Sequence, residues 1–414
     1  MSAPSLPISQ PKLTDSSRIV DVRVTEVAFA DPPLLNSVGV HQPYALRAVV
    51  EVETEDGVVG LGETYADTTH VLRLRAVAAA LPGLDVFALN RIRSTVADTL
   101  AGLALTGGDG VAGMITTAST TDRVFSPFEV ACLDAQGRLT GRSVSDLLGG
   151  AVRDAVPFSA YLFYKWAAHP GDTGDSWGAA LDADGVVTQA RKMITEYGFG
   201  AIKLKGGVLP PDDEIEAIRA LRAAFPDTPL RLDPNAAWTV ETSLRVADAL
   251  TGVVEYLEDP TPGLAGMAEV AAQASMPLAT NMCVVAFDHL APAVAQDSVQ
   301  VVLSDHHYWG GLRRSATLAG ICETFGMGLS MHSNSHLGIS LAAMVHLAAA
   351  TPNLTYACDT HWPWKRPDED VIDSGALAFA DGAVAVPTEP GLGVTLDRDA
   401  LDRLHRQYLE CGIR

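Results

Sequence analysis

From Val156 onward, short runs of β-branched and apolar residues alternate with longer stretches that have helical spacing. The runs are VPFSAYLF, AIKLK, PLRLDPN, VEYLEDP, PLATN, VQVVLSD, GLSMHS and LTYACD. The stretches between them, such as DDEIEAIRALRAAF, are rich in Ala, Leu, Arg and Glu. Strands that alternate with helices of this length indicate βαβ units and a parallel sheet. Eight such strands fit a closed TIM-type (β/α)7β barrel better than an open sheet, and we expect this α/β barrel over residues 151–374.

The chain before the barrel has a different texture. Residues 18–63 form short alternating runs on both sides of Asp56-Gly57, which is typical of an antiparallel hairpin. Residues 69–150 have helical character, interrupted by a Gly- and Thr-rich loop over 105–121. Loops of this length are often binding loops or lids, so we expect the 105–121 and 31–45 loops to set specificity.

The two ends of the chain complete this division. From Gly375 the tail returns to short alternating segments. We therefore expect residues 375–414 to join residues 18–150 in one α+β capping domain. Residues 1–17 are polar and Pro-rich, which predicts a loose N-terminal arm.

Charge and composition argue against several classes of partner. The chain has 29 basic and 50 acidic residues and a net charge of −21, which disfavours nucleic acid and anionic membranes. Its five cysteines form no CxxC pair, and no Gly-rich nucleotide motif follows a predicted strand. No run reaches the ~18 apolar residues of a membrane helix, and no secretory signal opens the chain. We expect a soluble, cytoplasmic protein that assembles as a symmetric homo-oligomer.

Nearly every predicted strand ends in a polar or charged residue, and in a parallel barrel these ends line the active site. Lys203 and Lys205 lie two positions apart and therefore share one face of their strand. Two lysines on an interior face cannot be buried without anionic partners. The following strands end in the acids and amides Asp233, Asn235, Glu258, Asp259, Asn281, Asp305, Asn334 and Asp359. Successive strands with Asp, Glu and Asn provide three oxygen ligands, which suit one hard divalent cation.

Such a site is suited to removing a proton next to a carboxylate. The resulting enediolate needs a metal ion and a nearby cation to stabilise its charge. Lys205 can act as a base because the positive charges of Lys203 and the metal disfavour its protonated form. His332 can act as a second base, oriented by Asp305 at the end of the preceding strand. The two bases stand on the second and seventh strands and would flank the substrate carbon from two faces.

The ordered set KxK, Asp, Glu, Asn, Asp, His resembles the enolase superfamily in its mandelate-racemase-like branch, and most closely the glucarate dehydratase family. The likeness covers nearly the whole chain, including GLGETYAD, SPFEVACLDAQG, IKLKGG, RLDPNAAW, YLEDP, LATNM, MHSNSHLGISLA and DTHW. Asn281 is the most specific single mark, because many relatives have an acidic residue there. The resemblance implies Mg²⁺, rather than Mn²⁺, bound by Asp233, Glu258 and Asn281.

The resemblance also implies roles for the other residues. Lys205 and His332 would be the two bases, with Asp305 paired to the histidine. The implied reaction converts D-glucarate to 5-dehydro-4-deoxy-D-glucarate, and His332 takes the C5 proton and returns it to the leaving 4-hydroxyl. Lys205 would serve the C5 epimer, L-idarate. The implied substrate contacts are His41, Tyr161, Lys203, Asn235, Ser333, Asn334 and His361.

Two stretches depart from the family pattern. The segment TPGLAGM is shorter than in some relatives, which leaves Glu258 as the acidic candidate for the second ligand. Relatives continue past the final helix to an arginine thought to contact the distal carboxylate, whereas this sequence ends at Arg414. We therefore expect that Arg414 substitutes for that arginine or that the contact is missing.

Other interpretations stay open beside this one. The same site could act on a different acid sugar, or epimerise its substrate instead of dehydrating it. A non-catalytic barrel that binds a sugar acid or a metal is disfavoured, because both proton-transfer groups and all three ligands are present. Tyr161 could be a core residue and His41 an ordinary surface residue. Three further histidines, His306, His307 and His336, have no assigned role.

Overall fold

The hairpin predicted around Asp56-Gly57 is present in the computed structural model. The structure describes residues 15–103, 117–373 and 375–412. Gly57 adopts a φ of 76°, a left-handed conformation that glycine reaches without strain. The strands of this region are β1 (Ile19–Ala30), β4 (Tyr44–Thr54) and β5 (Val59–Tyr65). They form one antiparallel sheet in the order β1-β4-β5.

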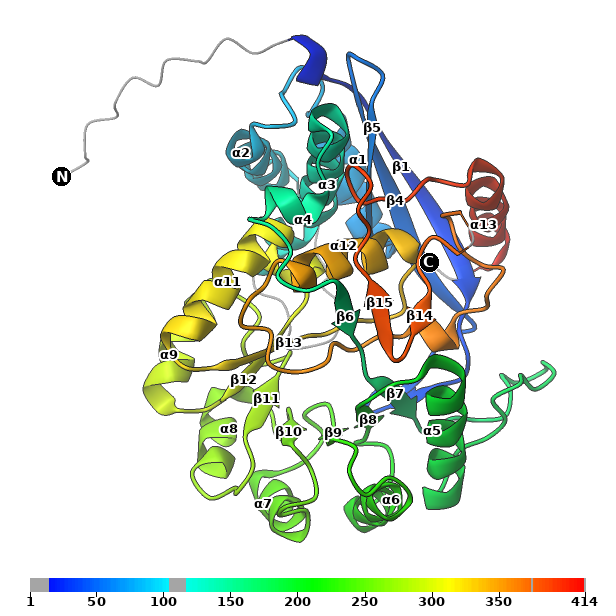
Figure 1. Ribbon diagram of the computed structural model, residues 1–414, viewed down its shortest axis with the longest axis vertical. Helices are drawn as coiled ribbons and strands as arrows, with labels where there is room; N and C mark the ends of the chain where they lie inside the picture. The colour runs from blue at the N-terminus through cyan, green and yellow to red at the C-terminus, as the bar shows by residue number, and fades with distance from the viewer. Residues whose placement is uncertain (1–14, 104–116, 374, 413–414) are drawn as a thin grey trace.

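Helix α3 (Thr117–Thr140) packs directly against β5. Two glycines of β5 make this approach possible, because a Cβ at Gly60 would overlap the carbonyl of Ala131 and one at Gly62 the carbonyl of Pro127. The other helices here are α1 (Thr68–Ala78), α2 (Leu89–Ala101) and α4 (Val144–Leu147). Figure 1 shows α1 and α3 on one side of the sheet, which lies above the barrel.

Three segments that were predicted to be irregular contain short regular elements among the described residues. The predicted loop over 105–121 is wrong in its last part, because residues 117–121 already belong to α3, and residues 104–116 lie outside the described residues. The Thr-rich start has weak helix propensity, which the packing of α3 on β5 overrides. Within the predicted arm, Asp15–Ser17 form a 3-10 turn, and Ser17 Oγ donates a 2.8 Å hydrogen bond to Asp85. The 31–45 loop contains a short antiparallel pair, β2 (Leu35–Asn36) and β3 (Gly39–Val40).

The second half of the described chain is the predicted TIM-type barrel. Seven parallel strands follow one another around a single curled sheet in chain order. They are β7 (Ala160–Phe163), β8 (Ile202–Lys205), β9 (Leu230–Asp233), β10 (Tyr256–Glu258), β11 (Leu278–Thr280), β12 (Val301–Ser304) and β13 (Gly328–Met331). Their apolar side chains are almost completely buried and fill the barrel.

The eighth predicted strand, around Cys358, closes the ring with a few hydrogen bonds instead of a full ladder. On one side Thr355 N donates to Leu329 O at 2.9 Å and Asp359 N to Met331 O at 2.8 Å, both on β13. On the other side Ser159 N donates to Cys358 O at 2.8 Å, just before β7. The pairing is one isolated parallel bridge. It nevertheless brings Asp359 to the same rim as the other strand ends.

Helices cover the outside of the barrel. They are α5 (Ala183–Tyr197), α6 (Pro211–Ala224), α7 (Val240–Ala249), α8 (Gly263–Ala271), α9 (Phe287–Gln296), α11 (Leu312–Thr324) and α12 (Gly338–Ala349), followed by the 3-10 turn η2 (Trp362–Trp364). The short, buried helix α10 (His306–Trp309) instead follows the end of β12 and packs against α3. Among the described residues, no helix is long and apolar enough to cross a membrane. Helix α12 is buried all round, and Glu63 on β5 accepts hydrogen bonds from Leu337 N and Ser340 N at its start. The N-terminal sheet thereby binds the element that follows β13.

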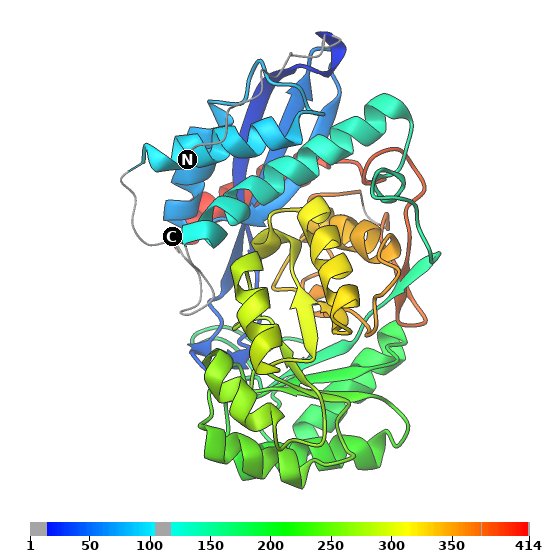
Figure 2. The ribbon, with the colours of Figure 1, turned by 90° about the vertical axis from the view of Figure 1, so that its left-hand side faces the viewer.

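The tail runs along both parts of the molecule. Strands β14 (Phe379–Ala380) and β15 (Ala383–Ala385) join β6 (Ala155–Pro157) in a small antiparallel sheet. Helix α13 (Arg398–Glu410) then packs on β1, where Gln407 Nε2 donates to Ala28 O at 3.1 Å. Figure 2 shows the N-terminal sheet and its helices at one end and the barrel at the other.

Candidate active site

Lys203 of β8 is the centre of a buried charge cluster. Its Nζ lies 2.7 Å from Asp359 Oδ2, 2.7 Å from Glu258 Oε2 and 3.2 Å from Asp233 Oδ2, and 4.6 Å above the Tyr161 ring. Burial alone would lower the pKa of Lys203, but the surrounding carboxylates outweigh it and raise this pKa well above its ordinary value. The cluster therefore stabilises the charged form of Lys203.

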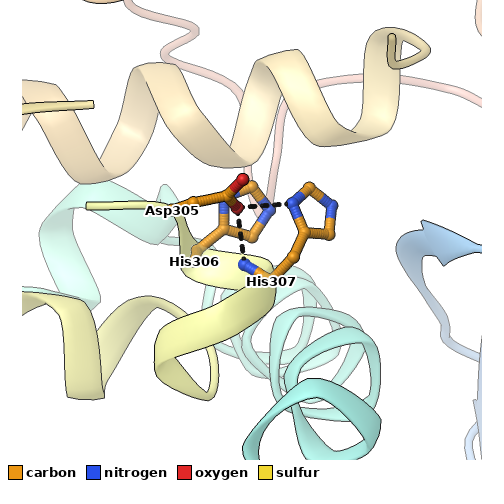
Figure 3. Close-up of side chains that lie close together, drawn as sticks. All are labelled: Asp305, His306 and His307. Carbon is orange, nitrogen blue, oxygen red and sulfur yellow. Dashed lines mark hydrogen bonds and ion pairs between the residues drawn. The ribbon is translucent and has the colours of Figure 1, made fainter. Parts of the chain in front are cut away.

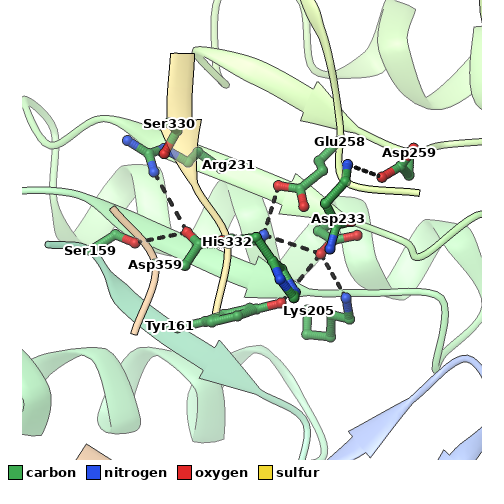
Figure 4. Close-up of polar contacts among 12 residues, drawn as sticks. Ser159, Tyr161, Lys205, Arg231, Asp233, Glu258, Asp259, Ser330, His332 and Asp359 are labelled. Carbon is green, nitrogen blue, oxygen red and sulfur yellow. Dashed lines mark hydrogen bonds and ion pairs between the residues drawn. The ribbon is translucent and has the colours of Figure 1, made fainter. Parts of the chain in front are cut away.

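Lys205, two residues further on, points into the same cluster. Its Nζ donates to Asp233 Oδ2 at 2.7 Å and to Asn235 Oδ1 at 2.9 Å. Asn235 has a φ of 55°, and its Nδ2 donates to Ser37 Oγ at 3.0 Å. The end of β9 is thus held by the 31–45 loop. Figure 4 shows Lys205, Asp233 and Glu258 pointing toward one another from neighbouring strands, with the His332 ring in the same group.

The predicted metal ligands supply buried oxygen atoms in need of a cation. Both carboxylate oxygens of Glu258 and Oδ1 of Asn281 are buried and, within the described part of the chain, accept no hydrogen bond. Lys203 Nζ is close to Glu258 Oε2 but is not aligned as its donor. Burial and the charge of Asp233 raise the pKa of Glu258 well above its ordinary value. This donor set fits a hard divalent ion, which would satisfy these oxygens together with Asp233.

Asp259 holds Asn281, one of the predicted ligands, in place through hydrogen bonds. This role was not predicted from the sequence. Its Oδ2 accepts from Asn281 N at 2.8 Å and its Oδ1 from Thr280 Oγ1 at 2.6 Å. These contacts orient Asn281 at the end of β11. Burial raises the pKa of Asp259 to about 7. The only sequence signal was its place directly after Glu258.

His332 and Asp305 form the predicted pair. His332 Nδ1 lies 3.0 Å from Asp305 Oδ2. The other oxygen, Oδ1, accepts from the backbone N of His307 at 2.9 Å and faces His307 Nδ1 at 2.8 Å. Burial would raise the pKa of Asp305, but its contacts with His307 and His332 hold this pKa well below its ordinary value. Asp305 is therefore an anion that can orient His332.

Ser333, His361 and Tyr161 lie around this pair. Ser333 Oγ lies 3.4 Å from His361 Nδ1, and the rings of His361 and Tyr161 are 4.9 Å apart. Burial lowers the pKa of His361 well below its ordinary value, and the nearby Lys205 ammonium acts in the same direction. The barrel brings the second and seventh strand ends to a common site.

His41 and Asn334, two of the predicted substrate contacts, lie at the edge of this site. His41 Nδ1 lies 3.0 Å from Asp31 Oδ2, and Ser335 Oγ donates to the same oxygen at 3.2 Å. Asp31 therefore joins the 31–45 loop to the segment after β13. Asn334 is turned toward the N-terminal sheet, where its Nδ2 donates to Tyr65 OH at 2.8 Å.

Asp305, His306 and His307 form a second group of metal-type ligands, with one ligand atom of each residue within 4.8 Å of the others (Figure 3). Arg47 Nη2 lies 2.9 Å from His307 Nε2, so this ligand atom already accepts a hydrogen bond from a guanidinium. Both oxygens of Asp305 already face N–H groups. The oxygen set around Glu258 is therefore the better metal site.

The chain matches two protein families in order along its length. Residues 19–149 match the family described as Mandelate racemase / muconate lactonizing enzyme, N-terminal domain, and residues 185–400 match Enolase C-terminal domain-like. The chain is 54% identical over 405 residues to a Streptomyces coelicolor protein named Probable glucarate dehydratase, covering 96% of this chain and 93% of the relative.

Solved structures agree with this match. An enolase from Mycobacterium smegmatis complexed with tartrate is 73% identical, with a TM-score of 0.92, covering 96% of this chain and 93% of that chain. An enolase from Thermobispora bispora complexed with magnesium and formate is 65% identical, with a TM-score of 0.94, covering 96% and 95%.

Proposed function

This chain belongs to the enolase superfamily, in its mandelate racemase branch, and from that premise we propose that it is a magnesium-dependent dehydratase of acid sugars. The proposed substrates are D-glucarate and its C5 epimer L-idarate, and the product is 5-dehydro-4-deoxy-D-glucarate. One observation carries the proposal. Lys205 and the His332–Asp305 pair stand at the ends of two strands of one barrel, beside buried oxygens that accept no hydrogen bond from the described residues.

The relatives support the metal and the class of substrate. The relative from Streptomyces coelicolor is named a probable glucarate dehydratase. The relative from Mycobacterium smegmatis was solved with tartrate, a hydroxylated dicarboxylate, and that from Thermobispora bispora with magnesium. A hydroxylated dicarboxylate together with a hard cation is what the buried carboxylates, amide and lysines of this site would bind.

Asp233, Glu258 and Asn281 are the residues that would hold Mg²⁺. When bound, the ion supplies positive charge beside the substrate carboxylate and so makes the neighbouring C–H more acidic. Asp233 is ready for this role, because the lysines hold its pKa below its ordinary range although burial opposes them. Its contact with Lys205 links metal binding to the freedom of that lysine.

His332 acts on D-glucarate through Nε2, because Nδ1 faces Asp305. It takes the C5 proton, and the electron pair of the broken C–H bond expels the 4-hydroxyl. The proton on Nε2 passes to that hydroxyl, which leaves as water, so His332 returns to its starting state. The enol formed between C4 and C5 then tautomerises, with a solvent proton added at C4 and the enol proton lost, to give the 5-keto product. On L-idarate the C5 proton points the other way, and Lys205 Nζ takes it.

The remaining predicted residues would bind and orient the diacid. They are His41, Tyr161, Lys203, Asn235, Ser333, Asn334 and His361. Lys203 is fully buried among Asp233, Glu258 and Asp359, so a contact with the substrate carboxylate requires it to exchange one of these partners. The ligation of a metal by Glu258 would free Lys203 for that exchange.

The test is turnover of a panel of aldarates and aldonates with Mg²⁺, followed by detection of 2-keto acid and by NMR in D2O. We expect 5-dehydro-4-deoxy-D-glucarate from D-glucarate and L-idarate, and deuterium incorporation at C5 of the remaining substrate. Turnover of a monoacid, with glucarate, idarate and galactarate all inert, would overturn the substrate assignment. Epimerisation without keto acid would replace dehydration, and binding without any C5 exchange would identify a non-catalytic barrel.

A further inference from the structure

Five buried side chains form a continuous chain from the N-terminal sheet to His332. Arg47 Nε donates to Glu63 Oε1 at 2.8 Å, and Arg47 Nη2 lies 2.9 Å from His307 Nε2. His307 Nδ1 lies 2.8 Å from Asp305 Oδ1, and Asp305 Oδ2 lies 3.0 Å from His332 Nδ1. The five residues are between 1% and 6% exposed. Water therefore competes little for these contacts.

The direction of the hydrogen bonds follows from the arginine. A guanidinium has donors only, so His307 Nε2 must be the acceptor in its contact with Arg47. Ser340 Oγ accepts from Arg47 Nη2 at 3.1 Å and lies 3.0 Å from the same Nε2, to which its hydroxyl can donate. An imidazole that accepts at Nε2 carries its proton on Nδ1. That proton points at Asp305 Oδ1.

Asp305 consequently accepts three N–H groups: two from His307, at the backbone and at Nδ1, and one from Nδ1 of His332. Resting on the proposed role of His332 as a base, we propose that Arg47 and His307 are positioning residues for it. They hold Asp305 as an oriented anion, which keeps the proton of His332 on Nδ1 and its lone pair on Nε2. Neither residue touches the substrate.

These residues lie on the Nδ1 side of His332, next to Ser333 and Asn334, which line the same cavity. Arg47, His307, Asp305, Ser340 and His332 line a cavity of about 10 Å³, which is room for a single water molecule at most. Arg47 and Glu63 belong to β4 and β5, whereas the histidines belong to the barrel. The capping sheet thus contributes to proton placement in the barrel, in addition to covering it.

Two substitutions of His307 distinguish the effect of its N–H donor on Asp305 from the effect of its ring on packing. His307→Asn keeps an N–H donor near the place of Nδ1 but loses most of the ring, whereas His307→Phe keeps the ring and loses the donor. We expect His307→Phe to lower kcat for D-glucarate roughly 10- to 100-fold, the usual effect of losing a partner behind a functional group. His307→Asn should recover most of that loss. Deuterium exchange at C5 of L-idarate, which uses Lys205, should fall much less in both variants.

The proton positions can also be measured without any substrate. Two-bond ¹H–¹⁵N spectra of the histidine-labelled protein should show His307 and His332 protonated on Nδ1 and unprotonated on Nε2. In Arg47→Met the preference of His307 for this tautomer should be lost. This variant leaves Glu63 without its partner, so its folding is checked first; if it unfolds, the wild-type spectrum and the His307 variants still decide.

His346→Phe serves as the matched control, because His346 is equally buried but bonds Ser145 and Leu392 instead of Asp305. It should lose stability while keeping the ratio of D-glucarate to L-idarate exchange. The proposal is overturned if wild-type His307 carries its proton on Nε2, or if His307→Phe is as active as His307→Asn. If the wild-type protein turns over neither sugar, the proposed function fails, and the spectra still test the proton placement.

Discussion

Lys205 on β8 is the register partner of Asp233 on β9, and its Nζ donates a 2.7 Å hydrogen bond to Asp233 Oδ2. A proposed base and a proposed metal ligand therefore share one buried contact. An ion that binds Asp233 competes with Lys205 for that oxygen and disfavours a second positive charge beside it. If Asp233 holds the proposed metal, metal binding and the activation of Lys205 are coupled through this carboxylate.

The metal site predicts opposite effects of Glu258→Gln on the free and the metal-bound protein. The Glu258 oxygens are buried without hydrogen bonds, so removing the charge should leave the metal-free protein equally stable or more stable. Mg²⁺ should raise the melting temperature of the wild-type protein, since a ligand at 100 times its Kd adds about 2.7 kcal/mol. Glu258→Gln should lose this response in a thermal shift titration. Glu216→Gln, on the exposed face of α6, should keep it.

If the two bases act on opposite faces of the substrate, each substitution should abolish C5 proton exchange of only one epimer. Lys205→Ala should abolish C5 exchange of L-idarate, and His332→Ala should abolish that of D-glucarate, each by roughly 10²- to 10⁴-fold. Dehydration of both sugars should fail in His332→Ala, because His332 also protonates the leaving hydroxyl. NMR in D2O measures exchange and product together. Lys192→Ala, on α5, is the control for loss of a lysine. Equal losses on both epimers in each variant would contradict the opposed arrangement.

We expect protonation of His346 to lower the free energy of unfolding in mild acid. Its Nδ1 accepts from Ser145 N at 3.2 Å and its Nε2 faces Leu392 O at 3.1 Å. Burial lowers the pKa of His346 to about 4, whereas a histidine of the unfolded chain keeps about 6.5. Between these values the unfolded state binds more protons, so this part of the unfolding free energy is present above about pH 6.5 and is lost as pH falls toward 4.

Urea unfolding from pH 4 to pH 7 checks this prediction. His346→Gln cannot titrate, so its stability should depend less steeply on pH in this window. It should also be roughly 1–2 kcal/mol less stable at pH 7, because an amide fits the two backbone groups imperfectly. A variant with the wild-type slope would assign the acid sensitivity to another buried histidine, such as His336.

We expect the close packing of α3 on β5 to require glycine at position 62. A Cβ at this position would overlap the carbonyl of Pro127, so Gly62→Ala should destabilise the protein by roughly 1–3 kcal/mol or more. Gly320→Ala is the matched control. Gly320 lies on α11 with nothing near its Cβ direction, and alanine there should add about 0.5–1 kcal/mol. Chemical denaturation measures both, and equal stability of the two variants would mean that the helix can move away from the strand.

The barrel and its polar rim could be predicted because both depend on short-range pattern. Apolar runs of strand length mark the core, and the residue that ends each run, such as Asp233 or Asn281, must lie at the rim. Closure by the eighth segment was predicted as a strand, although only a single bridge forms around Cys358. The start of α3 was missed because its Thr-rich sequence is typical of a loop. A cytoplasmic location and a homo-oligomeric assembly concern relations outside one chain and stay predictions.

By itself, then, the sequence determined which residues reach the rim: strand order and side-chain alternation are local properties, and they place Lys203 and Lys205 on one face. Only the tertiary structure decided which of them touch. Arg47 meets His307 across 260 positions of the chain, and Lys203 meets Asp359 across 156. Such pairs leave no periodic pattern in the sequence, because a buried charge needs an opposite charge or an acceptor nearby but does not specify which residue provides it. The fold alone decides which residue lies next to it.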